Sequence, residues 1–110
     1  MLTYHLLPRE TYDPAAAEYL PAAYASEGFI HTTRHLAMIP AVANRYYRAD
    51  PRPYLLLTVD LARLAVPWRY DAAGDAYPHL YGPINRAAIL GARPLPRAAD
   101  GTFLALLSPP

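Results

Sequence analysis

The sequence predicts an α+β fold with a mostly antiparallel sheet. The segments with helical features lie in the first half of the chain, whereas most β-prone segments lie in the second half. The 110 residues suit a single small domain spanning residues 1–110. The 13 prolines are distributed along the chain, so they indicate the turns of a compact fold and not a polyproline linker.

The first part of the chain predicts a strand, a short helix and a second strand. Residues 2–7 alternate weakly in polarity and stop at Pro8, which favours a strand. Residues 9–18 contain possible N-cap side chains, a proline suited to a first helical turn and three alanines, which favour a short helix. Residues 19–26 predict a turn or a single helical turn, and the apolar segment 28–32 predicts a short buried strand.

A second helix is expected to follow, with Thr32 or Thr33 as its cap, and to run to about Tyr47. Apolar residues recur along it at helical spacing, as Ile39 and Ala43 do. Pro40 lies inside this stripe. We expect it to kink or split the helix, because proline removes one backbone hydrogen bond.

The second half of the chain predicts mainly strands. Residues 54–59, YLLLTV, form the strongest strand pattern and are predicted to be central in the sheet. Pro67 places the next strand near a sheet edge. The later segments are a strand, an irregular aromatic stretch and two late strands joined by a turn at Asp100-Gly101: residues 66–70, 77–83, 87–94 and 102–107.

Composition excludes several classes of function. The formal net charge is +1 and there is no lysine, so neither a nucleic acid nor a membrane is an expected partner. The absence of cysteine removes disulfides, thiolate nucleophiles and thiolate metal sites. No secretory signal and no run of about 20 apolar residues is visible, so a cytoplasmic protein is expected. The expected partner is a small molecule or nucleotide.

Histidine is the informative residue type, because it titrates near neutrality. His5 and His31 lie in predicted strands, and His79 lies in a rigid segment between two prolines. We predict that these three side chains converge on one pocket and carry catalysis there. The pocket would be lined by the hydroxyl groups of Thr32, Thr33 and Tyr81. The alternative is three separate histidines, each bonded to a backbone carbonyl.

Two other groups of polar residues allow a functional interpretation. A three-histidine metal site is disfavoured, because the histidines are far apart in sequence and lack HxH or HExxH spacing, so no metal is expected. Asn44, Arg45 and Arg48 at the end of the second helix would suit a phosphate or carboxylate. They would equally suit a solvated helix end, where the helix dipole favours cations.

Four segments of the sequence occur together in a known family. They are Tyr4-His5, the EGFIHTT motif at 27–33, Asn44-Arg45-Tyr46-Tyr47 and the YPHLYGP motif at 77–83. They resemble the small bacterial proteins of family 952 among the domains of unknown function. With the late Pro94-Leu95-Pro96 segment and the Asp100-Gly101 turn, the resemblance covers nearly the whole chain. That family is similar to the ADP-ribosyltransferase superfamily. The resemblance implies a split, strongly bent β-sheet around a cleft for NAD or a related nucleotide.

The resemblance also implies roles for individual residues. His5 stands where the superfamily has a first-strand histidine that bonds a ribose hydroxyl. His31 stands in the glycine-led strand, where it would stack on the ligand or act as an acid or base. The PHLYG segment, with His79, falls near the third catalytic position, and Asn44 and Arg45 are candidate ligand-binding residues.

The sequence departs from the superfamily in two ways. His31 replaces the usual tyrosine or serine, and no glutamate lies in or after the third strand, where Asp71 and Asp75 are the nearest acids. RNA 2′-phosphotransferases of the superfamily also lack the glutamate, but they need an arginine-rich site that this chain does not match. An NAD-dependent enzyme is therefore one expectation, and a non-catalytic binding module on a degenerate transferase fold is the alternative.

Overall fold

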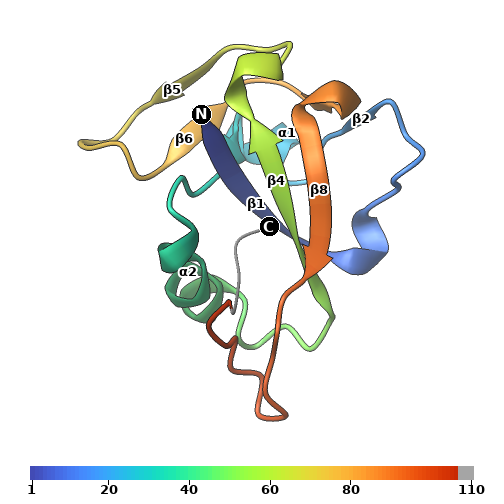
Figure 1. The fold of residues 1–110 in the computed structure, drawn as a ribbon, viewed down its shortest axis with the longest axis vertical. Coiled ribbons are helices and arrows are strands. Elements are labelled where there is room, and N and C mark those ends of the chain that lie inside the picture. The colour runs from blue at the N-terminus through green and yellow to red at the C-terminus, as the bar shows by residue number, and fades with distance from the viewer. Residues whose placement is uncertain (107–110) are drawn as a thin grey trace.

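A three-stranded antiparallel sheet forms the centre of the protein, in a computed structural model that describes residues 1–106 (Figure 1). Its strands are β1 (Leu2–Pro8), β4 (Tyr54–Asp60) and β8 (Ile89–Pro94), in the order β1-β4-β8. β4 is the middle strand, and its side chains from Tyr54 to Val59 are buried. The prediction that residues 54–59 form a central strand is therefore confirmed.

Side chains of β1 and β4 alternate between two apolar layers, as the period of two of a strand requires. Tyr4 and Leu6 pack with Leu56 against α2 (Ile39–Tyr46) on one face. Leu7 and Leu57 pack on the other face, against residues of the smaller sheets. Because both faces are covered, β1 and β4 appear as almost continuous apolar runs in the sequence.

Two smaller sheets cover the second face. One contains β3 (Ile30–His31), β6 (Pro78–Leu80) and β5 (Trp68–Tyr70), in the order β3-β6-β5. The other pairs β2 (Glu18–Tyr19) with β7 (Ile84–Asn85). The only other α-helix in residues 1–106 is the single turn α1 (Tyr24–Glu27), directly before β3. The predicted α+β class, with mostly antiparallel sheets and two helices, is confirmed.

One bridge joins the central sheet to the β3 segment. The backbone N–H of Tyr4 donates to the carbonyl of Thr33 at 2.9 Å, and the N–H of Thr33 donates to the carbonyl of Tyr4 at 2.9 Å. This pair of bonds fixes where the chain after β3 runs beside β1. It also sets the geometry of the candidate site described below.

The helix predicted within residues 9–18 is wrong. The structure has a 3₁₀ turn at Arg9–Thr11, followed by a turn in which the Asp13 carboxylate accepts the N–H of Ala15 at 2.9 Å. Glu18 and Tyr19 then pair with β7. Asp13 bonds the backbone of a local turn and does not cap a helix. Glu18 and Tyr19, at the end of the segment, are held in a strand by their tertiary pairing with β7.

The expected start of the second helix is also wrong. Thr33 lies in the bridge to Tyr4, and a 3₁₀ turn at Leu36–Met38 precedes α2. Pro40 does not kink the helix, because it occupies its first turn, where a missing N–H removes no intrahelical bond.

Two late segments also differ from the prediction. Residues 77–83 are not irregular throughout, since they contain β6, the middle strand of its sheet. Residues 102–106 form only an isolated bridge at Phe103 in place of a strand, and Leu107 lies outside the described residues. By contrast, β5 is an edge strand, as Pro67 predicted.

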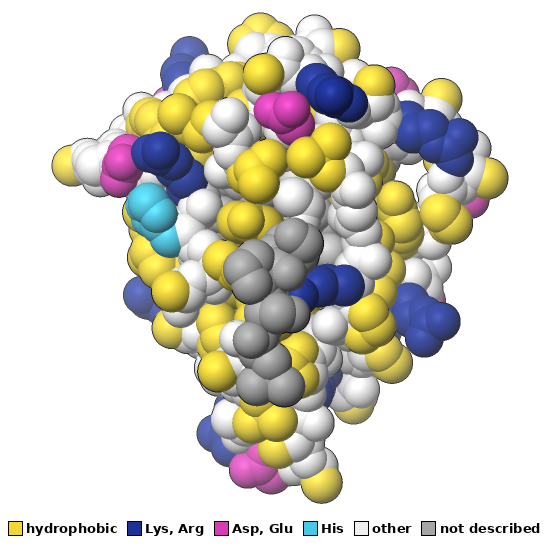
Figure 2. All heavy atoms as spheres, in the orientation of Figure 1, with side chains coloured by type: hydrophobic (Ala, Val, Ile, Leu, Met, Phe, Trp, Pro, Cys, Tyr) yellow, Lys and Arg dark blue, Asp and Glu magenta, His cyan; other side chains and the backbone are white. Residues whose placement is uncertain are grey.

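Two surface properties bear on the partners of the protein. Within residues 1–106, no helix combines the length and the apolar character that crossing a membrane requires. On the face shown in Figure 2, the basic side chains are scattered among apolar and acidic ones and do not gather in one patch.

A glycine substitution tests the turn after β6. Gly82 has a φ of 147°, and a Cβ there would lie 2.5 Å from Cγ1 of Val66. We expect Gly82→Ala to lower the free energy of unfolding by about 1–3 kcal/mol, through backbone strain and overlap. Gly91→Ala is the matched control, because Gly91 has no positive φ and a Cβ there would meet nothing within 4 Å. Equal urea midpoints for the two variants would contradict the expectation.

Candidate functional site: a notch at the edge of β1

Beyond the Tyr4–Thr33 bridge, β1 and the β3 segment separate and leave a small cavity, which we call the β1 notch. Its volume is about 30 Å³, which is room for one water-sized group. α2 and the residue after it close the side opposite β3. The lining residues are Tyr4, His5, Leu6, His31, Thr32, Thr33, Val42 and Tyr47.

His5 has a fixed tautomer and an unpartnered nitrogen. It is 7% exposed, and its Nδ1 lies 2.7 Å from the backbone carbonyl of His31. A carbonyl only accepts, so Nδ1 carries the proton and Nε2 presents a lone pair. Nε2 is buried and has no hydrogen-bond partner among residues 1–106. Burial lowers the pKa of His5 to about 4, so the imidazole is neutral at pH 7.

The backbone of Leu6 also faces the notch. The Tyr4 N–H and C=O point away from β4, toward Thr33. Because strand direction repeats every two residues, the N–H and C=O of Leu6 point to the same edge. Beyond the bridge no residue of 1–106 pairs with that edge at Leu6. The notch thus offers one backbone donor and one backbone acceptor beside the lone pair of His5.

His31 stands at the mouth of the notch. Its side chain is 60% exposed, and its Nε2 bonds the carboxylate of Glu27, four residues earlier. The pKa of the Tyr47 hydroxyl is raised mainly because the group is buried, and in second place by the negative charge of Glu27. Tyr47 therefore stays a neutral phenol, which can donate a hydrogen bond at the notch.

His79 does not line the notch but lies next to His31. The two residues are cross-strand partners in β3 and β6, and their ring centroids are 5.6 Å apart. Phe29 stacks on the His79 ring at 3.9 Å and meets the edge of His31 at 4.6 Å. His79 Nδ1 bonds Asp71 at 2.8 Å, and the Tyr81 hydroxyl donates to the same carboxylate. The three histidines thus form a continuous series, with only His5 and His31 against the cavity.

The other predicted ligand-binding residues have structural contacts. Thr32 Oγ1 accepts from Thr3 at 2.7 Å and donates to the carbonyl of Pro78 at 2.6 Å. Thr33 lines the notch and forms the bridge to Tyr4. Asn44 bonds both the N–H and the carbonyl of Phe103, at 2.7 and 2.9 Å.

Arg45, the predicted ligand-binding cation, does not line the β1 notch. Arg45 is exposed, and its guanidinium lies over the Tyr46 ring, 5.4 Å from the centroid. It is not among the residues that line the notch.

Sequence reasoning missed several residues of the site. Glu27 enters the prediction as part of a family motif, Tyr47 as part of a motif and as the expected end of the second helix, and Leu6 acts through its backbone. The i, i+4 spacing of Glu27 and His31 is a usable signal for their contact. Asp71 enters the sequence prediction only as one of the acids nearest the third catalytic position, and no local signal predicts its contacts with His79 and Tyr81.

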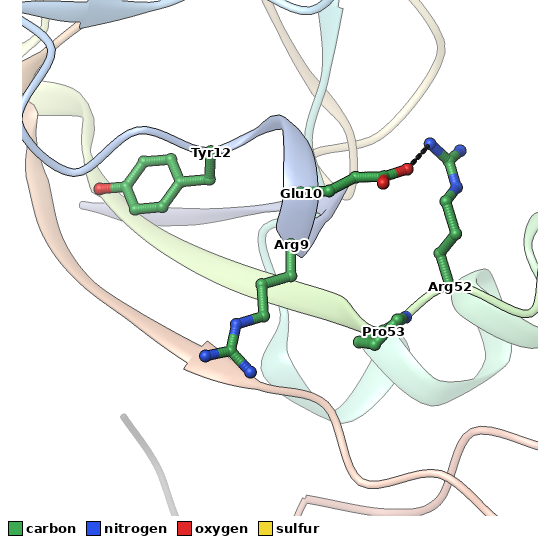
Figure 3. Close-up of a pocket in the computed structure, with 5 residues that line it drawn as sticks. All are labelled: Arg9, Glu10, Tyr12, Arg52 and Pro53. Atoms are coloured by element: carbon green, nitrogen blue, oxygen red, sulfur yellow. Dashed lines mark hydrogen bonds and ion pairs between the residues drawn. The ribbon is translucent and has the colours of Figure 1, made fainter.

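A larger cavity, of about 380 Å³, lies away from the histidines (Figure 3). Arg52 in its wall is bonded to Glu10 at 2.8 Å and to Asp50 at 2.8 Å. Its walls hold no buried polar atom without a partner among residues 1–106. This cavity is the larger of the two, but the β1 notch is the one that holds a buried polar atom without a partner among residues 1–106. No group of three or more His, Asp or Glu side chains in the described part of the chain is arranged to hold a metal ion.

Comparisons with known proteins identify relatives without a stated activity. A family described as "Protein of unknown function (DUF952)" matches residues 7–92, a span that begins two residues after His5. The crystal structure of protein CC0527 from Caulobacter crescentus is 26% identical, with a TM-score of 0.75 and 94% of each chain covered. A solution NMR structure of CC0527 is 27% identical, with a TM-score of 0.68, covering 91% of this chain and 89% of that one. No curated protein matches.

The state of His5 makes stability depend on pH. The pKa is about 4 in the folded protein and 6.5 in the unfolded chain, so the unfolded chain binds more protons between these values. The contribution of His5 is therefore fully present above pH 6.5 and is lost as the pH falls toward 4. We expect the unfolding free energy of the wild type, minus that of His5→Phe, to fall by about 3 kcal/mol between pH 7 and pH 4. Parallel pH profiles for the two proteins would show that His5 is not a buried neutral imidazole.

Proposed function

Because the chain belongs to a family of proteins of unknown function, DUF952, we propose its function from the geometry of the β1 notch. The protein binds a ribonucleotide of the ADP-ribose class, such as NAD. The observation that carries this proposal is the buried Nε2 of His5, which has no partner among residues 1–106.

A hydroxyl group of the ligand is the natural partner for this nitrogen. A buried acceptor without a hydrogen bond costs about 1–3 kcal/mol, and a donor from the ligand removes that cost. The Nδ1 bond to the His31 carbonyl holds the ring in one tautomer, so Nε2 is an acceptor before the ligand arrives. A ribose hydroxyl supplies the required donor.

The Leu6 backbone favours a ligand that also carries a carboxamide. One N–H and one C=O on the same strand edge complement the carbonyl and NH₂ of a primary amide. NAD contains a carboxamide and ribose hydroxyls in one molecule. The same pair of backbone groups would discriminate against ligands that carry only acceptors.

The size of the notch limits how much of the ligand enters it. A volume of about 30 Å³ admits one polar group at a time, either a ribose hydroxyl on His5 or a carboxamide on the Leu6 edge. The rest of the ligand lies outside, over His31 and Tyr47, where the imidazole and phenol faces suit a flat ring. Such a pose leaves much of the ligand accessible.

The same geometry bears on the choice between enzyme and binding module. NAD, when bound, supplies an N-glycosidic bond whose cleavage releases nicotinamide. The residues that line the notch include no carboxylate, and Glu27 at its mouth is already bonded to His31. This observation favours a non-catalytic binding module over an enzyme that cleaves NAD, and an assay of nicotinamide release from NAD separates the two candidates.

Ligand binding is measured by thermal shift with NAD, ADP-ribose, nicotinamide and AMP. Ligand at about 100 times its dissociation constant stabilises the folded state by about 2.7 kcal/mol. We expect a shift with NAD or ADP-ribose for the wild type and none for His5→Phe, which keeps a ring of similar volume without the nitrogen lone pair.

His35→Ala is the matched control, because His35 is half exposed and lies outside the notch, 3.7 Å from Asp75. It should keep the wild-type shift. Equal shifts for the wild type and His5→Phe, or no shift with any of the four ligands, would rule out the proposed site.

A further inference from the structure

Asp71 is held by three hydrogen-bond donors outside the β1 notch. Arg69 Nε donates to Oδ1 at 2.6 Å, His79 Nδ1 lies 2.8 Å from Oδ2, and the Tyr81 hydroxyl donates to the same oxygen. The Arg69 guanidinium also lies over the Tyr81 ring, 4.5 Å from the centroid. Led by the Tyr81 bond, these donors lower the pKa of Asp71 to about 2, so the carboxylate stays ionised in the neutral range.

These contacts follow from the register of the β3-β6-β5 sheet. His31 and Arg69 are both direct cross-strand partners of His79, from opposite sides. Residues two positions along a strand share its face. Asp71 and Tyr81, which follow β5 and β6, therefore lie on this face on either side of the Arg69–His79 pair. The opposite face of β6 points to the core through Leu80, which is fully buried.

The His79 ring is therefore fixed in orientation and in tautomer. Its side chain is 15% exposed, and Phe29 stacks on it with an angle of 13° between the ring planes. Because an ionised carboxylate only accepts, Nδ1 of neutral His79 carries the proton. Nε2 then presents a lone pair on the part of the ring away from Asp71, and His31 is the neighbouring imidazole.

The rings of His5 and His79 are thus held through the same nitrogen, Nδ1. Each has Nδ1 bound to an oxygen acceptor, a backbone carbonyl for His5 and a carboxylate for His79. His5 Nε2 is buried without a hydrogen-bond partner among residues 1–106, and the ring nitrogen of His79 that is bonded is Nδ1, to Asp71. His31, at the mouth of the notch, lies between them in the series.

We propose that Asp71 is a positioning residue for a second hydroxyl-binding site at His79 Nε2, so that the ligand must carry at least two separate hydroxyl groups. One hydroxyl donates to His5 and another to His79, with the body of the ligand across His31. This inference rests on the proposed function, because it extends the same ligand out of the β1 notch. Within the ribonucleotides of the ADP-ribose class, it selects molecules that can place separate hydroxyl groups on both imidazoles.

The test begins with the protein alone. Long-range ¹H–¹⁵N NMR spectra report which ring nitrogen of each histidine carries the proton. We expect the Nδ1–H form of His79 in the wild type and in Asp71→Glu, which keeps a carboxylate at this position. In Asp71→Asn the amide NH₂ can donate to Nδ1, so the Nε2–H form should appear, while the spectrum of His5 stays unchanged.

The second step adds ADP-ribose, the probe with two ribose units. We expect the Nε2 signals of His5 and His79 both to shift. The dissociation constant should rise about tenfold in Asp71→Asn, and Asp71→Glu should recover most of the affinity. Nicotinamide, which has no hydroxyl, should bind Asp71→Asn as it binds the wild type.

The outcomes separate the two proposals. A shift at His5 without one at His79, or equal affinity of the wild type and Asp71→Asn for ADP-ribose, would overturn the second site and leave the notch intact. An unchanged His79 tautomer in Asp71→Asn would overturn the positioning role. No response of either histidine to ADP-ribose would remove the proposed function, and the second hydroxyl site with it.

Discussion

The paired hydrogen bonds between Tyr4 and Thr33 are the constraint on which the site depends. Each is 2.9 Å long, and together they tie the central sheet to the chain that leaves β3. A strand pairing that continued past this point would bond Leu6 to the neighbouring segment and close the edge of β1. Because the segments separate, a strand edge remains open in the interior of a small protein, where an unpaired backbone group is ordinarily unfavourable. An unsatisfied polar edge of this kind needs a physical explanation, and it is the reason for which we propose a ligand there.

Buried hydrogen bonds stabilise the wall of the β1 notch at Thr32. Two short hydrogen bonds form a chain there: Thr3 donates to Thr32, and Thr32 donates to the carbonyl of Pro78. This chain links β1, the end of β3 and β6, which come from distant parts of the sequence. The histidines of these same segments therefore keep a fixed relation to one another, which long polar side chains on surface loops would not provide.

The sequence predicts the parts of the fold that have strong local patterns. Residues 54–59 are apolar throughout and become the central strand, and Pro67 marks the edge strand correctly. β2 and β7 have two residues each, and their pairing depends on tertiary contacts that no local pattern contains. The prediction for Pro40 is wrong because its effect depends on where the helix begins, which is set by the packing of Ile39 and Ala43.

In the candidate site, too, some features follow from the local sequence and others depend on tertiary contacts. Residue type together with predicted strand or proline-flanked positions singles out His5, His31 and His79, and the structure brings them into one series. Their hydrogen-bond partners could not be predicted in the same way. A backbone carbonyl orients His5, and Asp71 reaches His79 only because β5 and β6 pair in one particular register. The chemical state of each imidazole thus depends on tertiary geometry.

The strict alternation of β1 between two apolar layers has a consequence for variation in this protein. Inserting or deleting one residue before His5 would turn the imidazole toward α2 and bring a leucine or tyrosine into its position. Length changes within the exposed residues 72–74, which follow Asp71, do not move β1 side chains from one face to the other. Homologues should therefore keep the spacing between the first strand and its neighbours while they vary freely in the length of surface turns, and a gap within residues 2–8 of an alignment would indicate a misaligned sequence or a protein without the site.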